Sequence, residues 1–126
     1  MTAADIFKTA CGYLSQPPEE SDDVAGFAPG WLNVLLAESF EAENALRRAD
    51  GMPELTDVPF IGADTMQEEI PYHDMLTRIA LPYGLASDLE RDAEDDYRVN
   101  LFRNMYIAAL EEAARSVPEP VEDAYA

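Results

Sequence analysis

Apolar residues recur at helical spacing in four stretches of the chain. Over residues 1–16 they fall at i, i+3, i+4 and i+7, the stripe of a helix that buries one face. The same period predicts helices over residues 29–50, 71–87 and 97–116. Because this pattern covers roughly two-thirds of the chain, where about one-third is usual, we expect an all-α fold. We expect it to be a bundle of about four helices.

Residues that flank the first two stretches predict where the helices begin and end. Thr2 and Asp5 have the spacing of a capping box, and Pro17 predicts the end of the first helix. Gly51 is expected to end the second helix in a left-handed conformation. Residues 29–50 have an apolar arc too wide for a single stripe, so we expect contacts on more than one side of this helix. It is the predicted central helix of the bundle.

Two prolines bear on the third helix. Pro71 is expected in its first turn, where the missing N–H costs nothing. Pro82 predicts a kink or break near Leu81, because a proline inside a helix removes one backbone hydrogen bond and clashes with the preceding turn. The acidic run at residues 88–96 then predicts the start of the last helix, since carboxylates are favoured at a helix N-terminus.

Between the second and third helices, residues 52–69 lack helical periodicity. We expect a long irregular insertion here, with a short β-strand or hairpin as the alternative. A loop of this length in a compact domain is usually functional or disordered, and its apolar residues argue against disorder. Four of them are expected to pack onto the bundle: Leu55, Val58, Phe60 and Ile61.

Length and charge narrow the class of protein. The 126 residues suit one domain, so we expect a single helical domain over residues 1–116 and an extended acidic tail over 117–126. With 8 basic and 26 acidic residues the formal net charge is −18, which disfavours binding to nucleic acid or to an anionic membrane. The four predicted helices carry −1 of this charge, and the connectors and tail carry −17.

The sequence also bears on where in the cell the protein is located. No uncharged stretch approaches the roughly 20 apolar residues of a membrane span. Residues 1–11 lack the basic flank and apolar run of a signal peptide. A single cysteine excludes an internal disulfide framework. We therefore expect a soluble, intracellular type of domain.

Residues with catalytic or metal-binding chemistry are few. His73 is the only histidine, and beside Glu69 or Asp74 it has the chemistry of a base or a metal ligand. A ferritin-like dimetal site needs two histidines, so we expect a surface or packing histidine. Cys11 lies beside the stripe of the first helix and is expected to be buried. The acidic run at 88–96 lacks the glycine of an EF-hand loop. We expect no enzyme, no cofactor and no metal.

Residues 81–106 carry a recognisable combination of features. Leu-Pro-Tyr-Gly-Leu-Ala at 81–86 is followed by an acidic patch and by a last helix with a Phe-x-x-x-Tyr pair, Phe102 and Tyr106. In these features the chain resembles small proteins encoded among the head and tail genes of tailed bacteriophages, the head–tail connector (adaptor, or head-completion) family. The resemblance spans residues 70–125.

This resemblance implies a structural virion component. In the family that the chain resembles, the members are small helical bundles. They form a ring on the portal, often of twelve copies, between head and tail. The implied partners are other copies of the chain, the portal protein and tail or neck proteins, with no sequence-specific nucleic-acid binding and no membrane. The implied location is the head–tail junction of the virion, after assembly in the host cytoplasm. The family has no catalytic residues to carry over.

A ring subunit needs a compact body and extensions that reach its neighbours. The insertion and the tail are the expected extensions, because segments that order on assembly bury area between subunits. The residues expected to contact other subunits or the portal are Pro53, Val58, Pro59, Phe60, Ile61, Val117, Pro118, Pro120, Val121 and Tyr125.

Two other functions remain as alternatives. An acidic inhibitor that imitates DNA and blocks a host nuclease would place carboxylates along one continuous face at about phosphate spacing. The nearly neutral helices argue against it. A small non-enzymatic interaction module is the second alternative.

Overall fold

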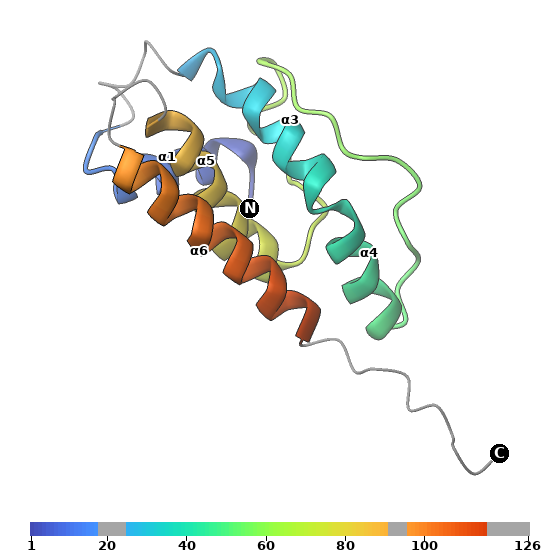
Figure 1. Ribbon diagram of the computed structural model, residues 1–126. Helices are drawn as coiled ribbons and strands as arrows, with labels where there is room; N and C mark the ends of the chain where they lie inside the picture. The colour runs from blue at the N-terminus through green and yellow to red at the C-terminus, as the bar shows by residue number, and fades with distance from the viewer. Residues whose placement is uncertain (18–24, 91–95, 116–126) are drawn as a thin grey trace, which may run out of the picture.

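All regular elements in the described part of the chain are helices. The structure, a computed structural model, describes residues 1–17, 25–90 and 96–115 (Figure 1). The expected all-α class is therefore confirmed, and the only β pairing within these ranges is an isolated bridge between Thr2 and Glu69. No helix among them is long and apolar enough to cross a membrane. The elements are α1 (Ala3–Tyr13), α3 (Ala28–Glu38), α4 (Phe40–Ala49), the π-helix η2 (Met75–Ala80), α5 (Leu81–Glu90) and α6 (Asp96–Arg115).

Helix α1 begins as the sequence predicts and ends earlier. Thr2 and Asp5 form the expected capping box. The helix ends at Tyr13, before Pro17, because Ser15 adopts a left-handed φ of 56°. The N–H of Gln16 then donates to the carbonyl of Cys11 at 3.0 Å and satisfies the last turn. Cys11 itself is buried, as expected.

The single helix expected over residues 29–50 is two helices. The helix is interrupted at Ser39, and α4 continues beyond α3 after this interruption (Figure 1). The buried Ser39 hydroxyl donates to the carbonyl of Leu35 at 2.7 Å, a local bond that competes with helical geometry and bends helices. Gly51 ends α4 with φ at 70°, as predicted.

The third helical segment starts at Met75, so Pro71 lies before its first turn and not in it. It begins as a π-helix and becomes an α-helix at Leu81, one residue before Pro82. The expected break near Leu81 thus takes the form of a change in helix type. A π-turn shifts each hydrogen bond by one residue, which accommodates a residue without an N–H.

Helix α5 is the central element, in place of the predicted 29–50 helix. It contacts α1, α3, α6 and η2, and all its residues are buried except the half-buried Tyr83. A Cβ atom at Gly84 would lie 2.8 Å from Leu35 Cδ2 and 2.9 Å from Tyr106 Cδ2. Gly84 therefore permits α5 to approach α3 and α6 closely.

An aromatic group joins α5 to α1 and α6. The Tyr83 ring stacks on Tyr13 from α1, with centroids 4.7 Å apart, and lies 6.4 Å from the Phe102 ring of α6. The Tyr13 and Phe102 centroids are 6.3 Å apart. Tyr83 and Phe102 of the 81–106 stretch thus have a packing role in this fold, whereas Tyr97 is 76% exposed.

The acidic run does not simply mark the start of the last helix. Its first residues belong to the end of α5, where Asp88 and Glu90 are buried, and Arg98 lies 3.6 Å from Glu90. Helix α6 begins at Asp96, and residues 91–95 lie outside the described residues.

The close approach at Gly84 gives a first prediction. Alanine normally stabilises a helix interior relative to glycine by about 0.5–1 kcal/mol. Gly12→Ala in α1 should do so because, apart from adjacent residues and the backbone of its own helix, no atom lies within 4 Å of the place its new methyl group would occupy. Gly84→Ala should instead lower the free energy of unfolding by about 1–3 kcal/mol, since it overpacks the contact with Leu35 and Tyr106. Urea denaturation of both variants tests this. Equal stabilisation by the two substitutions would contradict it.

Candidate functional site

The segment that joins α4 to η2, residues 50–73, is the most unusual part of the molecule, and we call it the arm. It contains no helix and no strand. In Figure 1 it runs back along the outer side of α4 and α3 before it turns towards η2. Backbone N–H and C=O groups that are buried away from water need hydrogen-bond partners. The arm thus has to be held by bonds other than those of a sheet.

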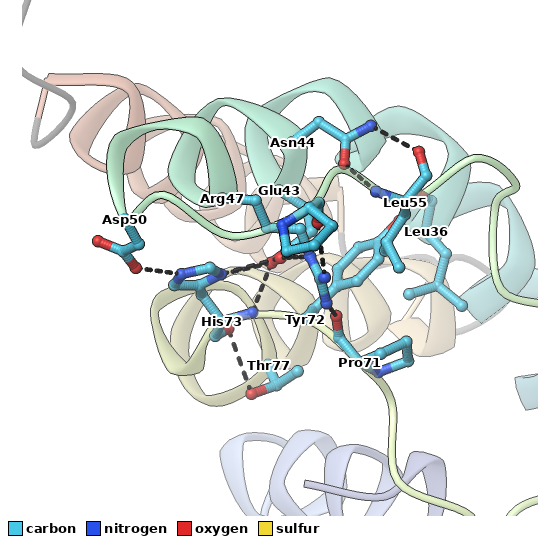
Figure 2. Close-up of polar contacts among 11 residues, drawn as sticks. Leu36, Glu43, Asn44, Arg47, Asp50, Leu55, Pro71, Tyr72, His73 and Thr77 are labelled. Carbon is cyan, nitrogen blue, oxygen red and sulfur yellow. Dashed lines mark hydrogen bonds and ion pairs between the residues drawn. The ribbon is translucent and has the colours of Figure 1, made fainter.

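Two asparagines on the neighbouring helices supply some of these bonds. The Asn33 side chain of α3 donates to the carbonyl of Ile61 at 2.9 Å and accepts from its N–H at 2.8 Å. Asn44 of α4 does the same with Leu55, at 3.1 and 2.8 Å (Figure 2). Each side-chain amide imitates the backbone of an adjacent strand, so the arm is paired at two points without a sheet.

Arg47 of α4 binds the backbone near both ends of the arm. Its Nε donates to Glu43 Oε2 at 2.7 Å. Its two terminal nitrogens donate to the carbonyls of Pro53, at 3.1 Å, and of Pro71, at 2.6 Å. The planar guanidinium can hold these three acceptors at once because its donors form a rigid fork.

His73 contacts two carboxylates, one in α4 and one at its C-terminal end. Its backbone N–H donates to Glu43 Oε1, its ring Nδ1 lies 2.9 Å from Glu43 Oε2, and its ring Nε2 lies 2.7 Å from Asp50 Oδ2 (Figure 2). Glu43 is fully buried. Both ring nitrogens face carboxylate oxygens, and only the protonated imidazolium has a donor for each. We call Glu43, Arg47, Asp50 and His73 the clasp.

The clasp favours a charged histidine. Burial alone lowers the pKa of His73. Hydrogen bonds to Asp50 and Glu43, together with the negative charges of these two carboxylates, outweigh burial and raise the pKa above its ordinary value of 6.5. Arg47 is the other cation beside Glu43, and Asp74 follows His73 at the start of η2.

A buried tyrosine next to the clasp anchors the end of the arm. The Tyr72 hydroxyl donates to the carbonyl of Leu36 in α3 at 2.6 Å. Burial and the nearby charge of Glu43 raise the pKa of Tyr72 far above its usual range, so the hydroxyl remains a donor. Figure 2 shows this ring beside the clasp, on the side of Leu36.

Helix α1 holds the arm from the opposite side. The N–H of Ala4 donates to the carbonyl of Met66 at 2.9 Å, and the N–H of Ile70 donates to the carbonyl of Met1 at 3.1 Å. The N-terminal ammonium lies 2.9 Å from Glu69. Glu69 is therefore not a partner of His73, and of the residues weighed beside this histidine in the sequence only Asp74 lies near it.

The side chains expected to contact partners divide into exposed and buried ones. Phe60 is 80% exposed and Val58 is 39% exposed, which corrects the expectation that both pack onto the bundle. Leu55 is half-buried and Ile61 is buried, so these two do pack there. Pro53 is exposed and Pro59 half-buried. The other expected contact residues, Val117, Pro118, Pro120, Val121 and Tyr125, lie outside the described residues.

An open pocket of about 550 Å³ lies beside the clasp, between the start of the arm, its end and η2. Its lining is mostly apolar. Neither Met52, which is 43% exposed, nor the pocket was apparent from the sequence, because the lining comes from three separate segments. The lining residues are Arg47, Met52, Pro71, Tyr72, His73, Asp74 and Met75.

The polar groups of the clasp bond to one another and to the arm, which is the arrangement of a structural centre. Among the described residues, no group of three histidine, cysteine or carboxylate side chains is placed to hold a metal ion. Comparison with models of protein families, with curated proteins and with solved structures finds no match. The arm, the clasp and the pocket are therefore the features from which a function has to be inferred.

The buried carboxylate gives a second prediction. Glu43→Ala should lower the free energy of unfolding by about 3–5 kcal/mol, because it leaves Arg47 and the His73 backbone without the partner they share. Glu41→Ala, at an exposed position in the same helix, should cost less than about 1 kcal/mol. Chemical denaturation of the two variants measures the difference. A similar small loss in both would show that Glu43 does not hold the arm.

The histidine gives a third prediction. Because its pKa is raised on folding from 6.5, the contribution of His73 to stability is complete below that pH and is lost as the pH rises through the higher folded value. His73→Asn keeps a donor near Glu43 without titrating. The stability advantage of the wild-type chain over this variant should therefore shrink as the pH rises. Denaturation curves at several pH values measure it, and an advantage independent of pH would contradict it.

Proposed function

We propose that this chain is a structural virion protein: a subunit of the ring that sits on the portal and connects head to tail. One observation carries the proposal. The arm is fixed to the helices at Leu55 and Ile61, and between these points it presents Phe60 with 80% of its surface exposed. Packing within the subunit gives no reason to expose a phenylalanine on a fixed loop.

A fixed arm suits assembly because it lowers the entropy lost on association. Segments that are already ordered cost less to bind than segments that must order at that moment. Exposed aromatic side chains are frequent anchors of protein interfaces. The asparagines and Arg47 thus maintain a contact element in one conformation, which supports a role in fitting against other proteins.

The proposal includes an architecture suited to a ring. Four helical units, α1, α3 with α4, η2 with α5, and α6, form the bundled body, and the arm is its insertion. Helix α5 packs against the three other units, so the body is rigid enough to set a fixed angle between neighbours. The similarity of residues 81–106 to connector proteins supports the same assignment.

The proposed partners are other copies of the chain, the portal protein and tail or neck proteins. The location is the head–tail junction, after assembly in the host cytoplasm. A formal charge of −18 supports a wall along which DNA slides without being gripped, because like charges repel. Binding, not catalysis, is the proposed activity, and it needs no cofactor.

The fourth prediction tests this function. Native mass spectrometry and negative-stain microscopy should find a closed ring of the purified chain, of about twelve copies as the connector resemblance implies, alone or on a portal protein. Deleting residues 117–126 should leave the midpoint of thermal unfolding nearly unchanged and weaken ring or portal binding, since terminal segments that order on assembly contribute to interfaces.

Two results would count against the proposal. A full-length chain that stays monomeric both alone and with portal protein would exclude a ring subunit. A truncated chain that unfolds would show that residues 117–126 belong to the core and are not an extension.

A further inference from the structure

Two surface features of the same subunit are complementary, and their pairing deepens the proposed function, on which it rests. We propose that Phe60 of one copy inserts into the pocket beside the clasp of the next copy, so that the ring grows through one repeated contact. The occupant of the pocket is thus a second copy of this chain.

The inserted element is the tip of the arm, residues 57–64. Phe60 is 80% exposed, with Val58 at 39% beside it. Asn33 holds the backbone at Ile61 with two hydrogen bonds, and the N–H of Gly62 donates to the Thr65 hydroxyl at 2.8 Å. The ring of Phe60 is therefore presented from a fixed backbone, and little chain entropy is lost when it is covered.

The receiving element is the open pocket of about 550 Å³. Met52 and Met75 lie in its wall with Pro71. Thioether sulfurs make favourable contacts with aromatic rings, and methionine adapts its shape to an inserted side chain. A phenylalanine ring fits this lining better than a charged or a small polar group would.

The tip cannot fill the pocket of its own subunit. Phe60 is held beside Asn33 of α3, whereas Arg47 of α4 forms the pocket. Asn33 and Arg47 are fourteen positions apart on α3 and α4, and α4 continues beyond α3 (Figure 1), so at about 1.5 Å per helical residue the two points are roughly 20 Å apart. The contact must therefore join two copies through different surfaces. Such head-to-tail contacts produce rings when the rotation between copies closes.

The charges around the two features do not oppose the contact. Asp57 and Asp64 flank Phe60 and are exposed, and no cation of the described residues lies within ion-pair distance of either. Three of the chain's eight basic residues, Arg47, Arg48 and Arg78, lie on the helices that border the pocket.

The carboxylates near the pocket are already paired. Glu43 and Asp50 bind Arg47 and His73 in the clasp. Asp74 lies 3.7 Å from Arg78, and Glu54 is paired with Arg48. In a chain with a formal charge of −18, three arginines and His73 thus balance the four carboxylates near the pocket, so an acidic tip meets little net repulsion there.

The fifth prediction uses two variants that each disable one side of the contact. Phe60→Glu removes the inserted ring, and Met52→Glu places a carboxylate in the pocket. Each alone should be monomeric in high salt, where the wild-type chain forms oligomers because its net charge is screened. Mixed, the M52E chain still offers its Phe60 and the F60E chain still offers its pocket, so the mixture should form a 1:1 dimer and nothing larger.

Analytical ultracentrifugation and native mass spectrometry of each variant and of the mixture measure this, with thermal unfolding as the check on folding. Phe27→Ala, at another exposed phenylalanine that lies on the turn before α3, is the matched control and should still oligomerise.

Several results would overturn the inference. It fails if F60E and M52E still form rings, if their mixture stays monomeric, or if Phe27→Ala is equally disruptive, and in each case the proposed ring function survives. It also fails if the wild-type chain is monomeric alone but forms a ring on portal protein. A wild-type chain that is monomeric under both conditions overturns the ring function as well.

Discussion

The arm depends on the burial of one carboxylate. Taking Glu43 out of water is costly, and the cost is offset only because three N–H groups meet its two oxygens: Arg47 Nε, the His73 backbone and the His73 ring. Those same donors belong to the residues that hold both ends of the arm. The hydrogen bonds that offset the burial of Glu43 therefore also fix the path of residues 50–73.

Side chains replace a sheet in this part of the molecule. The two asparagine amides and the Arg47 guanidinium pair with arm backbone at Pro53, Leu55, Ile61 and Pro71. A β-strand would have satisfied more backbone groups but would have left an edge open to unwanted pairing. The observed arrangement keeps the arm extended, and it leaves Phe60 as the most exposed large apolar side chain of the arm.

The sequence predicts the helices well because their apolar period is strong, and it predicts the Thr2 capping box and the Gly51 cap from local chemistry. The break at Ser39 has no proline or glycine to signal it; it arises with the bond from Ser39 to Leu35. The clasp was missed for a related reason. Glu43 and His73 are 30 positions apart, whereas the sequence alone suggests the nearby Glu69 and Asp74 as partners of His73. The central position of α5 was hidden because Pro82 and Gly84 interrupt its pattern, although Gly84 is what permits its close packing.

The clasp and the pocket share Arg47 and His73, and this links the internal structure of the arm to the proposed contact with a neighbour. An aromatic ring seated in the pocket excludes water from these two cations and strengthens their attraction to Glu43, because electrostatic interactions grow as the local dielectric falls. Coupling of this kind is reciprocal. An arm held firmly by its own clasp forms a better pocket, and a filled pocket holds the arm more firmly, so each contact in the proposed ring would make the subunit that offers the pocket more rigid.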